Sequence, residues 1–595
     1  MHHRRPWFNR RNATLALVSL LAAQAGLVAW AAYRYAPVTD EPGQLAAGLS
    51  HWKLGRFELY RVTPPLVRSV AALPVLFADH NTDWSHYPIG IGTRADGQVG
   101  MDFLQANGSR SFWLMTTARW ACIPFALLGG LVCFLWARDL YGTAGGILAP
   151  TLWCFSPDIL GHGCLITTDV AGASLSIATF YIFRRWLLHR AWTAAVFAGI
   201  CLGLVLLAKA TYVIYFGLLP ALWLLWNLRR DTQSPPSAWR RDILQLATLF
   251  VTALYVVNTA YAFDGSLKRL GKYVFVSQSL AGEEVEESVG GNRFADTPLG
   301  LVPVPFPEQY VLGVDLQRTY FEHRMLSYLG GEWKRGGWWY YYLYGLAVKM
   351  PLGTWILLLL AASLTVSGRF RGTLREDLLL LAPSIVILVL VSSQTGFNKN
   401  LRYVMAIYPF LFIWIGRVLA LAAMKVRWVR PATLLAAGWA VGSSLWVYPH
   451  SLSYFNEAAG GPTEGHRHLI HTNIDQGQDL LYLRDWVIEH PSPEPLYVAY
   501  YGIVDPTFAG IRYSLPRRDP LTGRWPPGRY AVSVNMLRGH RWMLPTGQGR
   551  WEGIDDDRYA SFLDREPIGR AGYSIYIYDV SGEEAQSQGF RATEG

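Results

Sequence analysis

Residues 13–33 read ATLALVSLLAAQAGLVAWAAY, and this apolar stretch is the first of a series that decides the fold class. Its roughly 20 residues are enough to cross about 30 Å of hydrocarbon as a helix. A signal peptide is the alternative, because basic residues precede the stretch and alanines follow its apolar centre. We favour a retained helix because of the length. In either case, residues from Arg34 onward are expected outside the cytoplasm.

Further apolar runs follow along the chain. We therefore predict an all-α polytopic membrane protein with about eleven transmembrane helices, some short, because spans must satisfy their backbone hydrogen bonds internally. These runs are Phe112–Trp136, Thr143–Phe155, Thr168–Trp186, Trp192–Leu207, Thr211–Trp226, Ile243–Ala262, Tyr340–Val366, Leu378–Val391, Val404–Ala423 and Thr433–Val447.

The composition agrees with a membrane bundle that carries polar segments. The 595 residues are 51% hydrophobic and only 16% charged, whereas ordinary globular chains are about 25% charged. This excludes a disordered chain, which needs low hydrophobicity and high charge. A mean hydropathy of +0.17 is nevertheless too low for a chain buried wholly in lipid. The five cysteines form no C-x-x-C pair, so a zinc or redox motif is unsupported.

The net charge of +10 is explained by topology rather than by a nucleic-acid partner. Basic residues gather in alternate loops, which the positive-inside rule places in the cytoplasm together with the N-terminus. These residues are Arg138, Arg184, Arg185, Arg190, Arg229, Arg230, Arg240, Arg241, Arg369, Arg371, Arg375, Arg417, Lys425, Arg427 and Arg430.

The large polar segments are then left on the outer face. Within a membrane module of residues 1–448, they are the outer loops 34–111 and 263–339. Residues 449–595 are predicted to form an extracytoplasmic α/β domain. Helical spacing covers Asp479–Glu489, and three apolar stretches are typical of strands: Leu496–Tyr501, Tyr530–Val534 and Tyr573–Tyr578.

Acidic residues stand where outer segments meet helices. Asp40 and Glu41 precede Pro42 and an apolar stripe, so they could simply cap a helix that lies on the membrane surface, or they could meet a lipid-borne substrate. Asp169 begins a span two helical turns after His162. A carboxylate there is costly and indicates a functional site, although a helix-start cap is the alternative.

Cations stand at the same face. Lys209, Lys349 and Arg402 lie at outer ends of apolar runs or just inside them, and Arg68 lies in a short amphipathic piece of the first outer loop. Each alone could be an anchor that reaches toward lipid phosphates. Together with the acidic sites they indicate an anionic, lipid-linked substrate. Neither G-x-x-x-x-G-K-[ST] nor H-E-x-x-H occurs, and the D-x-D of Asp555–Asp557 is interpreted as a solvated turn.

These motifs, in this order, resemble the lipid-carrier-dependent glycosyltransferases of the GT-C fold. The resemblance is to glycosyltransferase family 39, the protein O-mannosyltransferases and lipid A aminoarabinose transferases, and is closest to an uncharacterised bacterial branch. It covers about Thr39 to Leu483 and departs from the family pattern at Thr63, Arg68 and Gln476. The motifs are Asp40-Glu41, Pro64-Pro65-Leu66, His162 with Thr167-Thr168-Asp169, Gly336–Tyr341, Lys349-Met350-Pro351-Leu352, Leu401-Arg402-Tyr403, Tyr454–Glu457 and Asn473–Leu480.

The resemblance implies single-displacement transfer of a sugar from a polyprenyl-phosphate donor to an acceptor hydroxyl on the outer face, without a metal. It implies Asp40 as general base, with Glu41 and Asp169 as further catalytic residues. Arg402 and Arg68, with Lys209 and Lys349 behind them, would bind the donor phosphate. The implied substrate-orienting residues are His162, Tyr403, Asn473, Asp475 and Gln478.

Several alternatives stay open at this point. The acceptor could be a protein, a glycolipid or a polysaccharide, and no nucleic acid is expected. A transporter or flippase of the same lipid would bind the headgroup without catalysis, and an anchor would only present the C-terminal domain. Asn473 could also cap a helix that begins near Asp475.

Overall fold

The computed structural model describes residues 10–87, 90, 92–228, 236–282, 289–368, 374–420, 426–547, 550–554 and 557–581. Some predictions therefore lie outside the described residues: those on Arg229, Arg230, Arg369, Arg371, Lys425, Asp555 and Asp556.

Helices make up most of the described chain. Their bounds are α1 Arg10–Arg34, α2 Glu41–Leu54, α3 Leu66–Leu76, α4 Asp96–Asn107, α5 Arg110–Cys154, α6 Pro157–Gly163, α7 Thr168–His189, α8 Trp192–Ala208, α9 Tyr215–Asn227, α10 Pro236–Ala260, α11 Gln278–Ala281, α12 Glu308–Glu322, α13 Tyr341–Lys349, α14 Leu352–Val366, α15 Leu374–Ser393, α16 Ile407–Ile415, α17 Val429–Val447, α18 Gly461–His468, α19 Leu480–Glu489 and α20 Val534–Leu537.

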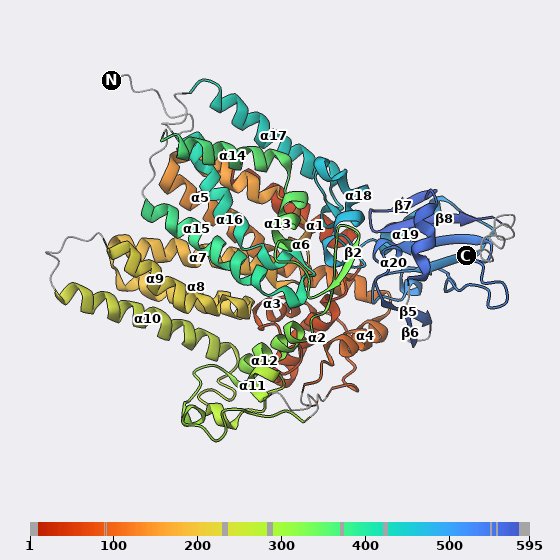
Figure 1. The fold of residues 1–595 in the computed structure, drawn as a ribbon, viewed down its shortest axis with the longest axis horizontal. Helices are drawn as coiled ribbons and strands as arrows, with labels where there is room; N and C mark the ends of the chain where they lie inside the picture. The colour runs from red at the N-terminus through yellow and green to blue at the C-terminus, as the bar shows by residue number, and fades with distance from the viewer. Residues whose placement is uncertain are drawn as a thin grey trace.

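The long helices gather at one end of the molecule and the C-terminal domain forms the other end. Figure 1 shows α7 to α10 and α14 to α17 in the bundle, with α19 and the late strands opposite them. The helices of the first outer segment, α2, α3 and α4, lie between these two regions and beside α12.

The described helices support fewer full spans than the sequence predicts. Four segments are long and apolar enough to cross a membrane, or up to six if each of two bent helix pairs is one span. The count of about eleven is thus not confirmed, although α3, α8 and Ile407–Leu419 are shorter apolar helices. Two predicted runs, Phe112–Trp136 and Thr143–Phe155, form one 45-residue stretch, α5, interrupted by non-helical backbone at Gly142.

Helix α2 forms where it was predicted, but it does not lie on a surface. Pro42 stands in its first turn, and Gly55 ends it in the left-handed conformation with φ 63°. Every residue from Glu41 to Ser50 is buried. A Cβ on Gly48 would lie 2.2 Å from the carbonyl oxygen of Arg68, so glycine is what lets α2 approach α3 this closely.

The C-terminal domain has the predicted mixture of helix and strands. Strands β3 (Leu496–Ala499), β4 (Gly528–Ser533), β8 (Ile575–Val580) and β7 (Gly569–Ala571) form one sheet in that order. Strand β3 is parallel to β4, and the other pairs are antiparallel. Two hairpins complete the described strands: β1 (Leu326–Leu329) with β2 (Glu332–Arg335), and β5 (Trp542–Gly547) with β6 (Arg550–Ile554).

Alternation along the strands explains how α19 packs on this sheet. Because successive strand side chains face opposite sides, Ala531, Ile575 and Ile577 share one face. They form a buried cluster with Leu480 and Leu483, one helical turn apart on α19. The predicted helix at Asp479–Glu489 and the three predicted strands are thereby confirmed.

The segment that precedes α19 lies along the chain that leads to α2. The backbone N–H of Ala36 donates to the carbonyl of Gln478 at 3.0 Å, and that of Thr39 donates to the carbonyl of Gln476 at 3.1 Å. The C-terminal domain therefore fixes the backbone immediately before Asp40.

Candidate active site

A cavity of about 1050 Å³ lies where the outer segments, the helix ends and the C-terminal domain meet. This is at the upper end of the size of ordinary ligand sites, which are about 300–1000 Å³. Among the predicted site residues, five line it: Asp40, Asp169, Lys209, Arg402 and Tyr403.

Four of these residues form a cluster of opposite charges, which we call the cavity cluster. Arg402 contacts Asp40 at 2.6 Å, between Nη2 and Oδ2, and its Nε lies 3.7 Å from Oδ2 of Asp169. Lys209 Nζ donates to Oδ1 of Asp169 at 2.8 Å. Two carboxylates thus balance two cations, with Arg402 between the acids.

Three members stand at helix ends, and Arg402 lies in the short 3-10 helix Leu401–Val404, which precedes α16. Asp40 directly precedes α2, yet its side chain makes no capping hydrogen bond, so the capping interpretation does not describe it. Asp169 is in the first turn of α7, where the helix dipole favours a carboxylate. Lys209 follows α8 in an extended conformation, and its Nζ lies 4.9 Å from the centre of the Tyr403 ring.

Glu41 belongs to a different set of contacts, which we call the buried cluster. Its carboxylate accepts from Arg119 Nε at 2.8 Å and from Nη2 at 2.5 Å. It also accepts from the backbone N–H groups of Ile166 at 2.8 Å and Val38 at 3.0 Å. Both charged side chains are 0% exposed. Glu41 is not among the residues that line the cavity, so its predicted part in catalysis stays a prediction.

Arg119 is the partner that sequence reasoning missed. Besides Glu41, it donates to the backbone carbonyls of Ala32, Tyr35 and Ala36 at 2.7–2.9 Å. It thereby ties α5 to the end of α1 and to the chain before Asp40. A single arginine in the apolar run of α5 was the signal, because ionisable residues in spans seldom lack a specific partner.

Two of the predicted phosphate ligands lie away from the cavity. Arg68 is 1% exposed, and its Nη1 donates to the carbonyl of Tyr60 at 2.5 Å. Lys349 is 2% exposed, and its Nζ donates to the carbonyls of Leu452 and Asn473 at 2.8 and 2.6 Å. Neither lines the cavity, so we leave both out of the phosphate-binding set.

His162 and Asp169 are not on one continuous helix. Helix α6 ends at Gly163, and its axis is bent by 116° from that of α7. A single helix therefore does not carry both residues on one face. His162 is buried, and its Nδ1 makes no hydrogen bond among the described residues; its side chain does not line the cavity.

The three predicted orienting residues of the C-terminal domain act on backbone rather than on the cavity. Asn473 does not cap α19; its Oδ1 accepts from the N–H of Leu401 at 2.8 Å, beside Arg402. Gln478 Nε2 donates to the carbonyl of Ile474 at 3.0 Å. None of the three is among the residues that line the cavity, and their predicted orienting role stays a prediction.

Asp475 is the most perturbed acid of this segment. It is 1% exposed, accepts from the N–H of Gly477 at 2.9 Å and is bonded to the hydroxyl of Ser533. Burial raises the pKa of its carboxyl to about 8, which the two hydrogen bonds oppose.

Further cavity residues were not predicted. Arg94 donates to both oxygens of Asp96, at 3.0 and 2.6 Å, and to the hydroxyl of Tyr320 at 3.0 Å. Lys399 also lines the cavity. The Arg-x-Asp spacing in the outer loop was the only available signal for the first pair. Among the described residues, no group of three His, Cys, Asp or Glu side chains is arranged to hold a metal ion.

Comparison with known proteins adds one partial match. Residues 112–258 match the family model of dolichyl-phosphate-mannose-protein mannosyltransferase, which agrees with the resemblance to glycosyltransferase family 39. This is less than half of the chain. Comparison with curated protein sequences gives no significant match.

Solved structures show a distant likeness. The crystal structure of ArnT from Cupriavidus metallidurans bound to undecaprenyl phosphate is 13% identical, covers 95% of this chain and 98% of that chain, and has a TM-score of 0.42. The apo oligosaccharyltransferase of Archaeoglobus fulgidus is 11% identical, covers 90% of this chain and 71% of that chain, and has a TM-score of 0.43. Both scores are below 0.5, so neither likeness bears on the function.

Proposed function

We propose that this chain is a multi-pass membrane glycosyltransferase. It moves a sugar from a polyprenyl-phosphate donor to an acceptor hydroxyl, on the outer face of the membrane. The observation that carries the proposal is the cavity cluster, in which Arg402 stands between Asp40 and Asp169 within a large cavity. The partial family match over residues 112–258 supports the same reaction class.

The cations of the cavity cluster suit a donor phosphodiester that releases polyprenyl phosphate, a phosphate monoester, as its leaving group. As the bond between the anomeric carbon and the phosphate oxygen breaks, that oxygen takes the electron pair and gains negative charge. Fixed cations aimed at this oxygen stabilise the transition state. Arg402 and Lys209 are the two cavity-lining cations held against the reacting carboxylates, and a guanidinium can bind two phosphate oxygens at once.

Phosphate binding would also prepare the base. In the structure Arg402 is paired with Asp40 at 2.6 Å, so the guanidinium occupies a carboxylate oxygen that a base would need. A donor phosphate competes with Asp40 for the same guanidinium. Asp40 is then released to take the proton of the acceptor hydroxyl as it attacks the anomeric carbon. A single displacement of this kind inverts the anomeric centre.

Asp169 has a supporting role in this scheme. It holds Lys209 at 2.8 Å and lies 3.7 Å from Arg402, so it fixes both cations in the cavity. Tyr403 lies beside Lys209 and restricts where its ammonium group can point. These contacts preorganise the phosphate site before the donor arrives.

The apolar wall of the cavity suits the isoprenoid chain of the donor. Val314 and Phe321 of α12 line it together with Leu390 and Val391 of α15. A cavity that combines such a wall with a few convergent charged groups is typical of sites for amphipathic ligands.

The test is to incubate the purified chain with a panel of radiolabelled polyprenyl-phosphate sugars and to ask what becomes labelled. Asp40→Asn should lower transfer by about 10²–10⁴-fold, the usual contribution of a general base. Binding of undecaprenyl phosphate should survive in this variant, because the cations remain.

The control for this substitution is Asp79→Asn, an acid of the same outer segment whose side chain is 91% exposed. It should leave transfer unchanged. Full transfer by Asp40→Asn would contradict the proposed base. Movement of the lipid across vesicles without any transfer, in the unaltered protein, would favour a flippase instead.

A further inference from the structure

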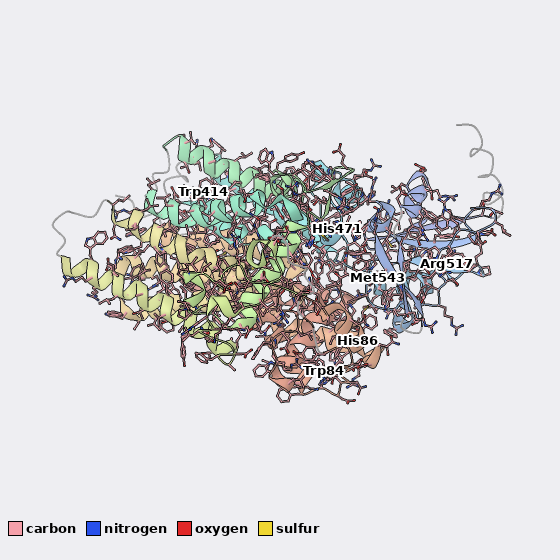
Figure 2. All side chains as sticks on the ribbon, turned by 60° about the horizontal axis from the view of Figure 1, so that its bottom comes forward. Trp84, His86, Trp414, His471, Arg517 and Met543 are labelled. Atoms are coloured by element: carbon pink, nitrogen blue, oxygen red, sulfur yellow. The ribbon has the colours of Figure 1, made fainter. Side chains whose placement is uncertain are left out.

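The C-terminal domain contributes a group of aromatic and imidazole rings to the same cavity. We call His471, Tyr501, His540 and Trp542 the ring cluster; all four line the cavity. The ring centres of His471 and His540 are 4.3 Å apart, and those of Tyr501 and Trp542 are 4.4 Å apart. Tyr501 and His540 join the two pairs at 5.2 Å. Figure 2 labels His471 where the C-terminal domain meets the helices, with Met543 beside it.

The protein itself fixes these rings. Trp333 of β2 stacks on His540, with the ring planes 10° apart, and its Nε1 donates to the carbonyl of Arg538 at 2.8 Å. Trp542 Nε1 donates to the carbonyl of Gly502 at 3.2 Å. The backbone N–H of His471 donates to Asn535 Oδ1 at 2.8 Å. Rigid rings of this kind lose little conformational entropy when a ligand binds.

The ring cluster differs electrostatically from the cavity cluster. Burial, together with the charge of Lys399, lowers the pKa of His540 to about 3. The pKa of His471 also lies well below its ordinary value, mainly because the ring is buried and also because His540 and Lys399 are close by. Both imidazoles are therefore uncharged near pH 7, each with one nitrogen that donates and one that accepts.

One of these nitrogens has no hydrogen-bond partner in the part of the chain that the structure describes. Nε2 of His471 is buried and makes no hydrogen bond among the described residues, although the residue is only 4% exposed and lines the cavity. Buried polar atoms are nearly always hydrogen-bonded, so an unused one beside a cavity points to a ligand.

We propose that the ring cluster binds a sugar ring and presents it to Asp40. A pyranose has an apolar face of C–H groups, which stacks on aromatic rings, and an edge of hydroxyls, which suits neutral imidazoles. Tyr501 lines the same cavity as Asp40 and Arg402. The proposal rests on the proposed transferase function, because a sugar bound here takes part in transfer only if Asp40 acts as the base.

Two sugars could occupy this position: the one carried by the donor and one that belongs to a glycan acceptor. Either would stack on the rings, but they differ in how they enter. The donor sugar arrives attached to the phosphate, whereas an acceptor sugar binds to a protein whose phosphate site is already filled.

The experiment measures binding of methyl glycosides to the full chain in lipid nanodiscs, by saturation-transfer NMR. The glycosides are those of mannose, glucose, galactose and N-acetylglucosamine, with and without undecaprenyl phosphate. Trp542→Ala is compared with Trp551→Ala, because Trp551 lies on the paired strand of the same hairpin and does not line the cavity.

We expect at least one glycoside to bind, and Trp542→Ala to weaken it by about tenfold while Trp551→Ala leaves it unchanged. Binding that persists with undecaprenyl phosphate present identifies an acceptor sugar. A donor sugar gives two different results. Undecaprenyl phosphate then excludes the glycosides, and the unaltered protein binds mannosyl phosphoundecaprenol more tightly than undecaprenyl phosphate. Trp542→Ala removes that difference in affinity.

The proposal is overturned if no glycoside binds, or if the two variants lose the same affinity. Undecaprenyl phosphate binding and Asp40-dependent transfer are measured on the same preparations. If lipid binding and transfer are both intact while no glycoside binds, the ring-cluster proposal alone has failed. If the unaltered protein transfers no sugar, the result counts against the proposed function.

Discussion

The cavity cluster and the buried cluster meet at the start of α2, where Asp40 belongs to one and its neighbour Glu41 to the other. The two clusters differ in how far their charged side chains are exposed. Glu41 and Arg119 are 0% exposed, and two backbone N–H groups complete the coordination of the carboxylate. Asp40 is 31% exposed and Arg402 11%, and their pair faces a cavity. The Glu41–Arg119 pair is buried and fully hydrogen-bonded, so we assign it to the stability of the fold. The Asp40–Arg402 pair faces a cavity, where a ligand can bind the cation, so we assign it to the reaction.

The two pairs should also differ in how much free energy of unfolding is lost when one partner is removed. Removing one partner of a sealed pair leaves an uncompensated charge away from water, which costs about 3–5 kcal/mol. Breaking a half-buried pair that faces a cavity costs less, because water can reach each partner when the other is gone. The buried cluster should therefore respond to mutation in stability, and the cavity cluster in binding and turnover.

The largest stability effect is expected from Glu41→Gln. It leaves Arg119 charged and buried without its carboxylate, so the free energy of unfolding should fall by about 3–5 kcal/mol. Chemical unfolding of the detergent-solubilised chain measures this. Glu41→Gln combined with Arg119→Met should recover much of the loss, since no unpaired charge is left. If Glu41→Gln keeps its stability but no longer transfers sugar, Glu41 takes part in the reaction itself.

A smaller effect is expected from Arg402→Lys. An ammonium cannot contact Asp40, Asp169 and a phosphate with the forked geometry of a guanidinium. Affinity for undecaprenyl phosphate should fall by about 10-fold to 100-fold, with little change in stability. Arg56→Lys, on an exposed pair with Glu58, is the matched control and should bind normally. Equal affinities for the lipid in all three proteins would remove Arg402 from the phosphate site.

A pH-dependent effect concerns Asp475, which belongs to neither cluster. Its pKa is about 8 in the folded chain and near 3.8 ordinarily, so between these values the folded state holds a proton that the unfolded state has lost. Stability should therefore fall as the pH rises from 5 to 8. Asp475→Asn should flatten that dependence in thermal unfolding at the two pH values. An identical slope for both proteins would mean that Asp475 is ionised when folded.

Sequence reasoning found the cavity cluster because its members interrupt apolar surroundings at helix ends. Asp40, Asp169 and Lys209 stand at such ends, and Arg402 lies in the short helix just before α16. Periodicity placed α2, α19 and three strands correctly. What it could not supply was orientation. Asp40 and Glu41 are equally acidic and adjacent, and only the fold shows which one faces the cavity and which one meets Arg119.

The remaining differences have the same origin. Lys349 and Arg68 looked like membrane-facing anchors, yet tertiary packing turns both toward backbone carbonyls. The bend between α6 and α7 separates His162 from the helix that carries Asp169. Asn473 holds Leu401 from a distance of 72 residues in the chain, which local pattern cannot reveal.

The most direct test is a structure of the full chain with undecaprenyl phosphate bound. The account predicts the phosphate between Arg402 and Lys209, with Asp40 no longer in contact with Arg402. The contacts between Glu41 and Arg119 should be unchanged. A phosphate bound elsewhere, with the Asp40–Arg402 pair intact, would contradict the claim that the cavity cluster performs the chemistry.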